Sequence, residues 1–126
     1  MPVDPVATAR ASYQAYVSKD RAAIEALIAP GFHFTSPLDN RIDRATYFER
    51  CWPNSRNLEG FEFIHLLEAN GRVFATYVGR NRDGHRFQNT EILTIVDGQI
   101  TDVEVYFGWS IPHPAAEGRY VEAAPS

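Results

Sequence analysis

The sequence predicts one α+β domain in which three helices near the N-terminus pack against a long antiparallel sheet. Up to about residue 53, apolar residues recur at three- and four-residue spacing, which is typical of helices that bury one side. From about residue 58, four alternating segments are separated by Asn-Gly and Asp-Gly pairs, which indicate antiparallel hairpins. The 126 residues, 44% of them hydrophobic, suit a single domain over 1–126.

Local signals place the three helices. Asp4-Pro5 is a favourable start for a first helix that runs to about Ser18. Asp20 can cap a second, shorter helix that reaches Ile28 and ends at Pro30-Gly31. Asp43 can cap a third helix, which Pro53 ends. All three carry an apolar stripe that needs a partner surface, so the helices should cover one face of the sheet.

The remaining segments read as strands and loops. Phe32–Ser36 alternates as a short strand and is followed by a loop over Pro37–Ile42. Ile111–Ser126 has no period and several prolines, so we expect a loosely ordered C-terminal extension over 111–126. The four long strands are Phe61–Glu68, Arg72–Arg80, Arg86–Val96 and Ile100–Phe107.

Composition argues against several function classes. The formal charge of −4, with scattered basic residues, provides no positive stripe for nucleic acid. Single Cys51 and four widely spaced histidines give no metal-site spacing, and we expect no metal or cofactor. The sequence shows no leader-like or membrane-spanning apolar run, so we expect a cytoplasmic protein with neither a nucleic-acid nor a membrane partner.

The order of elements and several local strings resemble the nuclear transport factor 2 superfamily, and within it the SnoaL-like polyketide cyclase and ketosteroid isomerase branch. The strings are Lys19–Ile28, Phe32–Pro37, Val96–Ile100 and Val103–Gly108. The resemblance covers about Val6 to Trp109 and implies a cone-shaped α+β barrel, in which three helices pack in the concave face of a strongly curved antiparallel sheet with a mixed edge. This scaffold hosts many chemistries, so it does not identify the reaction.

Ketosteroid isomerases supply specific comparisons. Ser36, before Pro37, occupies the position of their general-base aspartate, and a hydroxyl cannot replace a carboxylate base unaided. Their helix-one tyrosine falls near Ser12. Their second acid aligns with Glu91. In ketosteroid isomerases that acid stays protonated in an apolar site, which is a known example of a neutral carboxylic acid. Steroid isomerisation is therefore not expected.

Strand parity decides whether Glu91 faces inward. A two-residue turn at Asp97-Gly98 would group Glu91 with Asp102, Glu104 and Tyr106. A three-residue turn with Gly98 left-handed would group it with Val103, Val105 and Phe107. We adopt the second register, because it gives the concave side an apolar lining. It places Phe87, Asn89, Glu91, Leu93 and Ile95 inside, together with Thr76, Val78 and Arg80 of the preceding strand.

Glu91 then has two interpretations. It is either an acid whose pKa is raised by desolvation and that exchanges a proton with a ligand, or a structural acid paired with Arg80 or a tyrosine. Asn89 either orients a ligand carbonyl or bonds a backbone group. Tyr16 is either a donor or a core tyrosine, and His65 is the second choice of base because histidine titrates near neutrality.

The leading hypothesis is a cofactor-free isomerase, cyclase or lyase acting by acid–base catalysis on an apolar or polyketide-like substrate; the alternative is a non-catalytic binding protein for a small hydrophobic ligand. The catalytic candidates are Glu91, Tyr16 and His65. The ligand-binding candidates are Phe34, Ser36, Phe48, Trp52, Thr76, Val78, Asn89, Val103 and Phe107.

The outer sheet face also requires an explanation. Tyr77, Ile92, Thr94, Val96 and Tyr106 are predicted to lie there and would expose a sizeable apolar patch. We expect a homodimer through that face.

Overall fold

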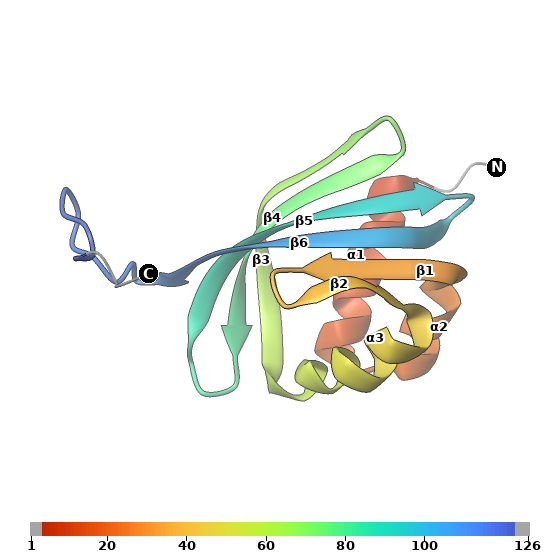
Figure 1. The fold of residues 1–126 in the computed structure, drawn as a ribbon, viewed down its shortest axis with the longest axis horizontal. Coiled ribbons are helices and arrows are strands. Elements are labelled where there is room, and N and C mark those ends of the chain that lie inside the picture. Colours follow the sequence, from red (N-terminus) through yellow and green to blue (C-terminus); the bar gives the residue numbers. More distant parts are fainter. Residues whose placement is uncertain (1–3, 123–126) are drawn as a thin grey trace.

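A computed structural model describes residues 4–122, which fold into helices packed against one curved, open sheet (Figure 1). The predicted α+β class is confirmed. The last four residues of the predicted tail, 123–126, lie outside the described residues. In chain order the elements are α1 Pro5–Ser18, α2 Arg21–Leu27, β1 Ile28–Ser36, β2 Asp39–Asp43, α3 Arg44–Arg50, the 3-10 helix η1 Trp52–Asn57, β3 Leu58–Ala69, β4 Arg72–Asn81, β5 Arg86–Val96 and β6 Gln99–Ile111.

Aspartate caps start all three α-helices, as the sequence predicts. The carboxylates of Asp4, Asp20 and Asp43 accept hydrogen bonds from the backbone N–H groups of the first turn, at 3.0, 3.1 and 2.9 Å. The first helix ends where Lys19 adopts a left-handed conformation with φ 58°. The second helix ends at Leu27 rather than Ile28, because Ile28 pairs with Ile100 and begins β1.

The strand order is β2-β1-β6-β5-β4-β3. All neighbours are antiparallel except β1 and β6, which run parallel and make the sheet mixed. The segment predicted as a loop after Ser36 instead contains β2, which pairs with β1 at the sheet edge. Its Asp-Asn-Arg composition disfavours a strand, but pairing to an available edge overrides that weak propensity.

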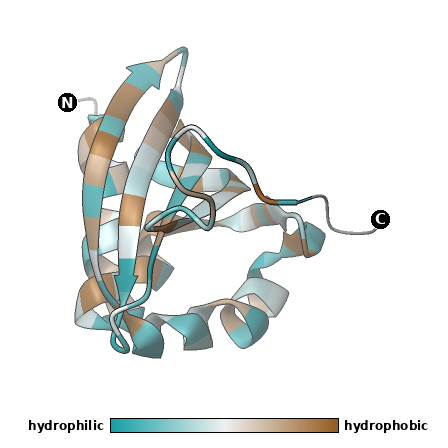
Figure 2. Cartoon of the chain, turned by 90° about the vertical axis from the view of Figure 1, so that its left-hand side faces the viewer, coloured by the Kyte–Doolittle hydropathy of each residue, from teal (hydrophilic) through white to brown (hydrophobic). Residues whose placement is uncertain are grey.

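Single unpaired residues interrupt the ladders and curl the sheet. Between β3 and β4 the pairing skips Ile64, and between β5 and β6 it skips Thr101 and Gly108. Such β-bulges bend a strand and increase its twist. The curled sheet and the helices enclose the core (Figure 2), whose most deeply buried large side chains are Phe32, Ile24, Leu93, Ile100 and Val73.

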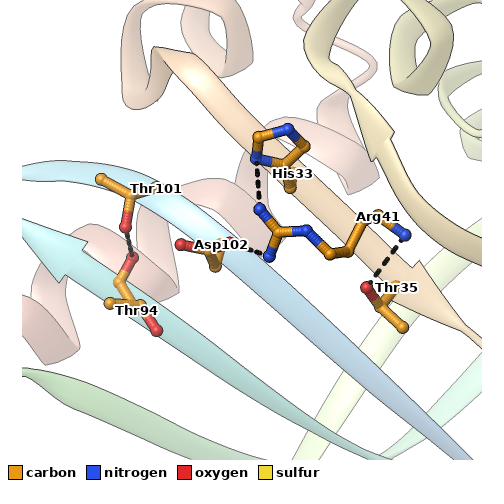
Figure 3. Close-up of polar contacts among 6 residues, drawn as sticks. All are labelled: His33, Thr35, Arg41, Thr94, Thr101 and Asp102. Atoms are coloured by element: carbon orange, nitrogen blue, oxygen red, sulfur yellow. Dashed lines mark hydrogen bonds and ion pairs between the residues drawn. The ribbon is translucent and has the colours of Figure 1, made fainter.

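The bulge at Thr101 decides which way Glu91 points. Val96 pairs with Gln99, so Asp97-Gly98 is a two-residue turn, and both of its residues have positive φ. The prediction of a three-residue turn is therefore wrong. The predicted face for Glu91 is nevertheless confirmed, because the extra residue at Thr101 shifts the register by one and pairs Glu91 with Val105. Figure 3 shows the Thr101 hydroxyl directed at the Thr94 carbonyl, 3.3 Å away.

Polar side chains also tie β2 and β1 to β6 (Figure 3). Arg41 on β2 approaches His33 Nδ1 at 3.3 Å and the Asp102 carboxylate at 3.9 Å. His33 thus has the inter-element role that its alternation with Phe32 and Phe34 indicates, and it points away from the core.

The β-bulge at Gly108 yields a test of this architecture. A methyl group at position 108 would collide with the backbone carbonyl of Gln88 on the paired strand. We expect Gly108→Ala to lower the free energy of unfolding by about 1–3 kcal/mol, the usual cost of forced overpacking, as measured by urea titration. Gly31→Ala is the control, since nothing lies within 4 Å of the added carbon. Equal stability of the two variants would contradict the bulge assignment.

Candidate functional site

A cavity of about 280 Å³ lies between the inner face of the sheet and the helices. It reaches the surface beside Leu38 and Phe107, whose side chains are 72% and 53% exposed. Most of its wall is apolar and aromatic, which suits a small organic molecule. The lining residues are Ser12, Tyr13, Tyr16, Ile24, Ile28, Phe32, Phe34, Ser36, Leu38, Asp39, Tyr47, Cys51, Asn54, Leu58, Phe61, Tyr77, Asn81, Phe87, Glu91, Leu93, Ile100, Val103, Val105 and Phe107.

Glu91 brings a carboxyl group to this apolar wall. It lies on β5 opposite Ala75 on one side and Val105 on the other. Its Oε2 accepts a hydrogen bond from the Tyr77 hydroxyl. Burial raises the pKa of Glu91 above its usual value of 4.5, although the nearby hydroxyls of Tyr77 and Tyr13 act in the opposite direction. Burial thus extends to higher pH the range in which Glu91 is protonated, the form that can donate a hydrogen bond to a ligand.

Tyr13 on α1 contributes a second potential donor. Its hydroxyl is buried and close enough to Glu91 for the two groups to affect each other's pKa, but within residues 4–122 it lacks a hydrogen-bond partner of normal geometry. Burial, and then the Glu91 charge, raise the pKa of Tyr13 well above its usual value, so the phenol keeps its proton. A buried unpaired hydroxyl facing a cavity is costly unless a ligand or water satisfies it.

Aromatic packing holds these hydroxyls in place. The Tyr13 ring packs edge-on against Phe61, Phe63 and Tyr77 at centroid distances of 4.8, 5.0 and 5.5 Å. Across the cavity, the hydroxyls of Tyr16 and Tyr47 hydrogen-bond to each other. Burial raises the pKa of Tyr16 and of Tyr77 as well, so neutral phenols surround the acid.

Asp39 forms a polar cluster near the surface end of the cavity. Its Oδ1 accepts from Arg50 Nε at 2.5 Å and its Oδ2 accepts from the Ser36 hydroxyl at 2.8 Å. Its side chain is 8% exposed, whereas that of Arg50 is 55% exposed. Burial alone would raise the pKa of Asp39, but the hydrogen bonds from Arg50 and Ser36 outweigh it and lower the pKa. Asp39 is therefore ionised at neutral pH.

The structure brings about half of the predicted site residues to the cavity. Those that line it are Glu91, Tyr16, Phe34, Ser36, Val103 and Phe107. Of the two structural interpretations of Glu91, hydrogen bonding to a tyrosine is what the structure contains, since Arg80 instead lies 3.6 Å from the Glu59 carboxylate.

Three predicted residues lie on the wrong face. His65 was predicted as a catalytic candidate, but the bulge at Ile64 reverses the alternation that Phe61 and Phe63 begin and leaves His65 exposed. Thr76 and Val78 also point outward, because β4 pairs Ala75 rather than Thr76 with Glu91. The Thr76 hydroxyl bonds that of Thr90 at 2.8 Å on the outer face.

Three others stand next to the site without lining it. Phe48 is buried behind the cavity wall, where it packs on Tyr47 at 5.4 Å. Trp52 packs edge-on against Tyr16 at 4.9 Å. The Asn89 amide oxygen accepts a hydrogen bond from the Gly108 N–H at 3.1 Å. Asn89 therefore bonds a backbone group, one of the two roles that the sequence indicates for it.

Sequence reasoning missed three polar residues of the cavity. Tyr77 was placed on the outer face, but the pairing of Tyr77 with Asn89 turns it inward. Tyr13 belongs to the predicted apolar stripe of the first helix, and its burial gave no sign that its hydroxyl would remain unpaired. Asp39 fell in a segment read as a loop; its spacing of three from Ser36 was the available signal.

Two further features of the structure concern metal binding and membrane crossing. Within residues 4–122, no three His, Cys, Asp or Glu side chains converge in a way that could hold a metal ion. None of the helices in the described part of the chain has the length and apolarity that crossing a bilayer requires.

Comparison with known proteins points to one family. The model of the SnoaL-like domain matches residues 9–103. A search of curated proteins finds no match. Solved structures do match this chain. Those that are less than 25% identical to it show a similarity of fold alone.

Three of these structures illustrate the range. A protein from Kribbella flavida, provisionally named a ketosteroid isomerase, is 20% identical over 97% of this chain and 90% of its own, with a TM-score of 0.71. An LEH-like epoxide hydrolase from M. tuberculosis is 14% identical over 82% of each chain, with a TM-score of 0.70. IdmH from Streptomyces antibioticus, provisionally named a polyketide cyclase, is 18% identical over 82% of this chain and 91% of its own, with a TM-score of 0.67.

The raised pKa of Glu91 predicts a pH dependence of stability. The folded chain holds this proton more tightly than the unfolded chain. The resulting stabilisation is complete below the unfolded value near 4.5 and is lost as pH rises through the raised folded value. We expect urea titrations to show that the wild type loses stability relative to Glu91→Gln across this window.

Glu62→Gln, at an exposed position of β3, is the matched control and should run parallel to the wild type. A wild-type curve that stays parallel to that of Glu91→Gln above pH 4.5 would show that Glu91 titrates as an ordinary surface acid.

Proposed function

Because the chain belongs to the SnoaL-like domain family, we propose that it binds a small apolar molecule in the cavity and acts on it by cofactor-independent acid–base catalysis. The observation that carries this proposal is that Glu91, whose pKa burial raises, lies beside the Tyr13 hydroxyl, which lacks a hydrogen-bond partner of normal geometry within residues 4–122. Both point to a ligand with a hydrogen-bond acceptor, such as a carbonyl oxygen, which would satisfy the two donors together.

Glu91 is the proposed proton carrier. Hydrogen bonds from its carboxyl group and from Tyr13 would stabilise negative charge that develops on a ligand oxygen, and the apolar wall would strengthen them. Tyr77 keeps the Glu91 carboxyl oriented through its hydrogen bond to Oε2. Tyr16, bonded to Tyr47, belongs to the wall as a secondary polar contact.

The reaction class is an isomerisation, cyclisation or lyase reaction of an apolar or polyketide-like substrate. Solved structures with this fold include one named an epoxide hydrolase and one provisionally named a polyketide cyclase, so the scaffold is compatible with an enzyme that acts on a small molecule. The second candidate is a non-catalytic binding protein for a small hydrophobic ligand. The specific observation in its favour is Ser36, which is not itself a base; the carboxylate beside it, Asp39, is held by Arg50 with a lowered pKa and is therefore a weak base.

We further propose a homodimer through the outer sheet face, in a cytoplasmic protein. Tyr77 faces inward and leaves the predicted patch, but Val96 and Tyr106 are each 52% exposed, and Ile92 and Thr94 are partly exposed. An exposed apolar face of this kind is stabilised when a second copy covers it.

Proton exchange tests the catalytic proposal without knowledge of the natural substrate. In D₂O, binding of acetophenone at Glu91 should make its methyl protons more acidic, and water in the cavity would accept them. We expect catalysed exchange, followed by proton NMR, to fall about 100-fold or more in Glu91→Gln, the usual range for a general acid. The rate should also fall as pH rises through the raised pKa of Glu91, because the acid then loses its proton.

The exposed variant Glu62→Gln should retain the exchange rate. Acetophenone that binds and is displaced from the cavity, but exchanges no faster than in buffer, would favour the binding protein over the enzyme.

The dimer is tested at its outer face. Val96→Lys combined with Tyr106→Lys should convert a dimer into monomers in sedimentation velocity runs, because two desolvated charges oppose association. Val17→Lys on α1, 36% exposed, should leave the dimer intact. A wild type that sediments as a monomer at all accessible concentrations would refute the proposal.

A further inference from the structure

The cavity contains a second carboxyl group, Asp39, which the proposed mechanism does not use. It lies at the start of β2 and lines the same cavity as Glu91. Its side chain is 8% exposed, although the residue as a whole is only partly buried. Acidic side chains so deeply buried usually have bonded partners, and Asp39 has two, Arg50 and Ser36.

Each Asp39 oxygen has one protein donor. A carboxylate offers about four lone-pair positions, so acceptor capacity remains for a ligand. Arg50 reaches Asp39 from α3 and Ser36 reaches it from the end of β1, so two separate elements hold the carboxylate in place. A positioned, ionised carboxylate accepts hydrogen bonds and cannot donate one.

The two acids therefore differ in hydrogen-bonding character. At Glu91, burial outweighs the hydrogen bonds and raises its pKa. At Asp39, the bonds from Arg50 and Ser36 outweigh burial and lower its pKa. In its protonated form Glu91 can donate, as the Tyr13 hydroxyl can, whereas the ionised Asp39 can only accept, and apolar walls such as Phe34 and Val103 line the same cavity.

We propose that the cavity selects molecules with two polar groups of opposite kind: a carbonyl-type acceptor for Glu91 and Tyr13, and a hydroxyl or N–H donor for Asp39. This inference rests on the proposed function for the Glu91 contact and adds the substrate class. A cavity of about 280 Å³ suits a substituted ring, given that one of ~150 Å³ accommodates benzene.

The test compares ring ketones that differ in one group. Isothermal titration of the full chain at pH 7 would compare meta- and para-hydroxyacetophenone with the corresponding methylacetophenones, which have nearly the same shape but no donor. We expect at least one hydroxyl isomer to bind about tenfold more tightly than its methyl partner, the typical effect of a hydrogen bond to a charged group.

Asp39→Asn supplies the matching variant. The amide replaces one acceptor oxygen by a donor and removes the charge, so the preference for hydroxyl over methyl should fall to about twofold or less. Glu49→Gln, at an exposed position on α3, should keep the wild-type preference. The comparison of the ligands on the wild type remains decisive even where Asp39→Asn does not fold.

The outcomes separate the two proposals. Ketones that bind without any preference for the hydroxyl isomers would overturn the role of Asp39 and leave the proposed function standing. A preference that persists unchanged in folded Asp39→Asn would also overturn it. Failure of every acetophenone to bind would overturn both proposals.

Discussion

The pairing register between β5 and β6 is the constraint on which the candidate site depends. Side chains alternate along a strand with a period of two, so a slip of one residue would turn Glu91 towards solvent and bring Glu104 opposite it. The two-residue turn at Asp97-Gly98 by itself gives that slipped register. The unpaired Thr101 shifts the register by one, so that the ladder pairs Glu91 with Val105 on the inner face. A local irregularity of one residue thus decides whether the cavity contains an acid.

The same strand pair shapes the open end of the cavity. A second bulge at Gly108, bonded by the Asn89 side chain, follows directly after Phe107 at the cavity opening. The Asn89 side chain therefore supports the backbone geometry of the opening. The two bulges act on different properties of the site: the first sets the orientation of Glu91, and the second sets the path of the backbone beside Phe107.

Local surroundings give chemically identical groups different properties. Both cavity acids are partly buried carboxyl groups, and burial favours the neutral form of each. Arg50 supplies Asp39 with a charged donor, whereas Glu91 has only neutral phenols as neighbours. A hydrogen bond from a charged donor stabilises an anion more strongly than a hydrogen bond from a neutral donor. The net shift of the pKa is therefore downward at Asp39 and upward at Glu91. Pairs of acids separated in this way are a general sign of divided roles in proton chemistry.

The sequence by itself determined the three helices with their aspartate caps, the four long strands and the presence of a turn at Asp97-Gly98, because these depend on residues close together in the chain. It also indicated Glu91 as an interior acid, although with the wrong turn length. Only the tertiary structure decided that His65, Thr76 and Val78 face outward, that Tyr77 faces inward, and that Tyr13 and Asp39 join the cavity. The alternation of side chains along one strand can be predicted from the sequence. Which side chains of two paired strands share a face, however, depends on which residue the pairing skips. That choice follows from long-range packing, and it leaves no local signal at Ile64 or Thr101.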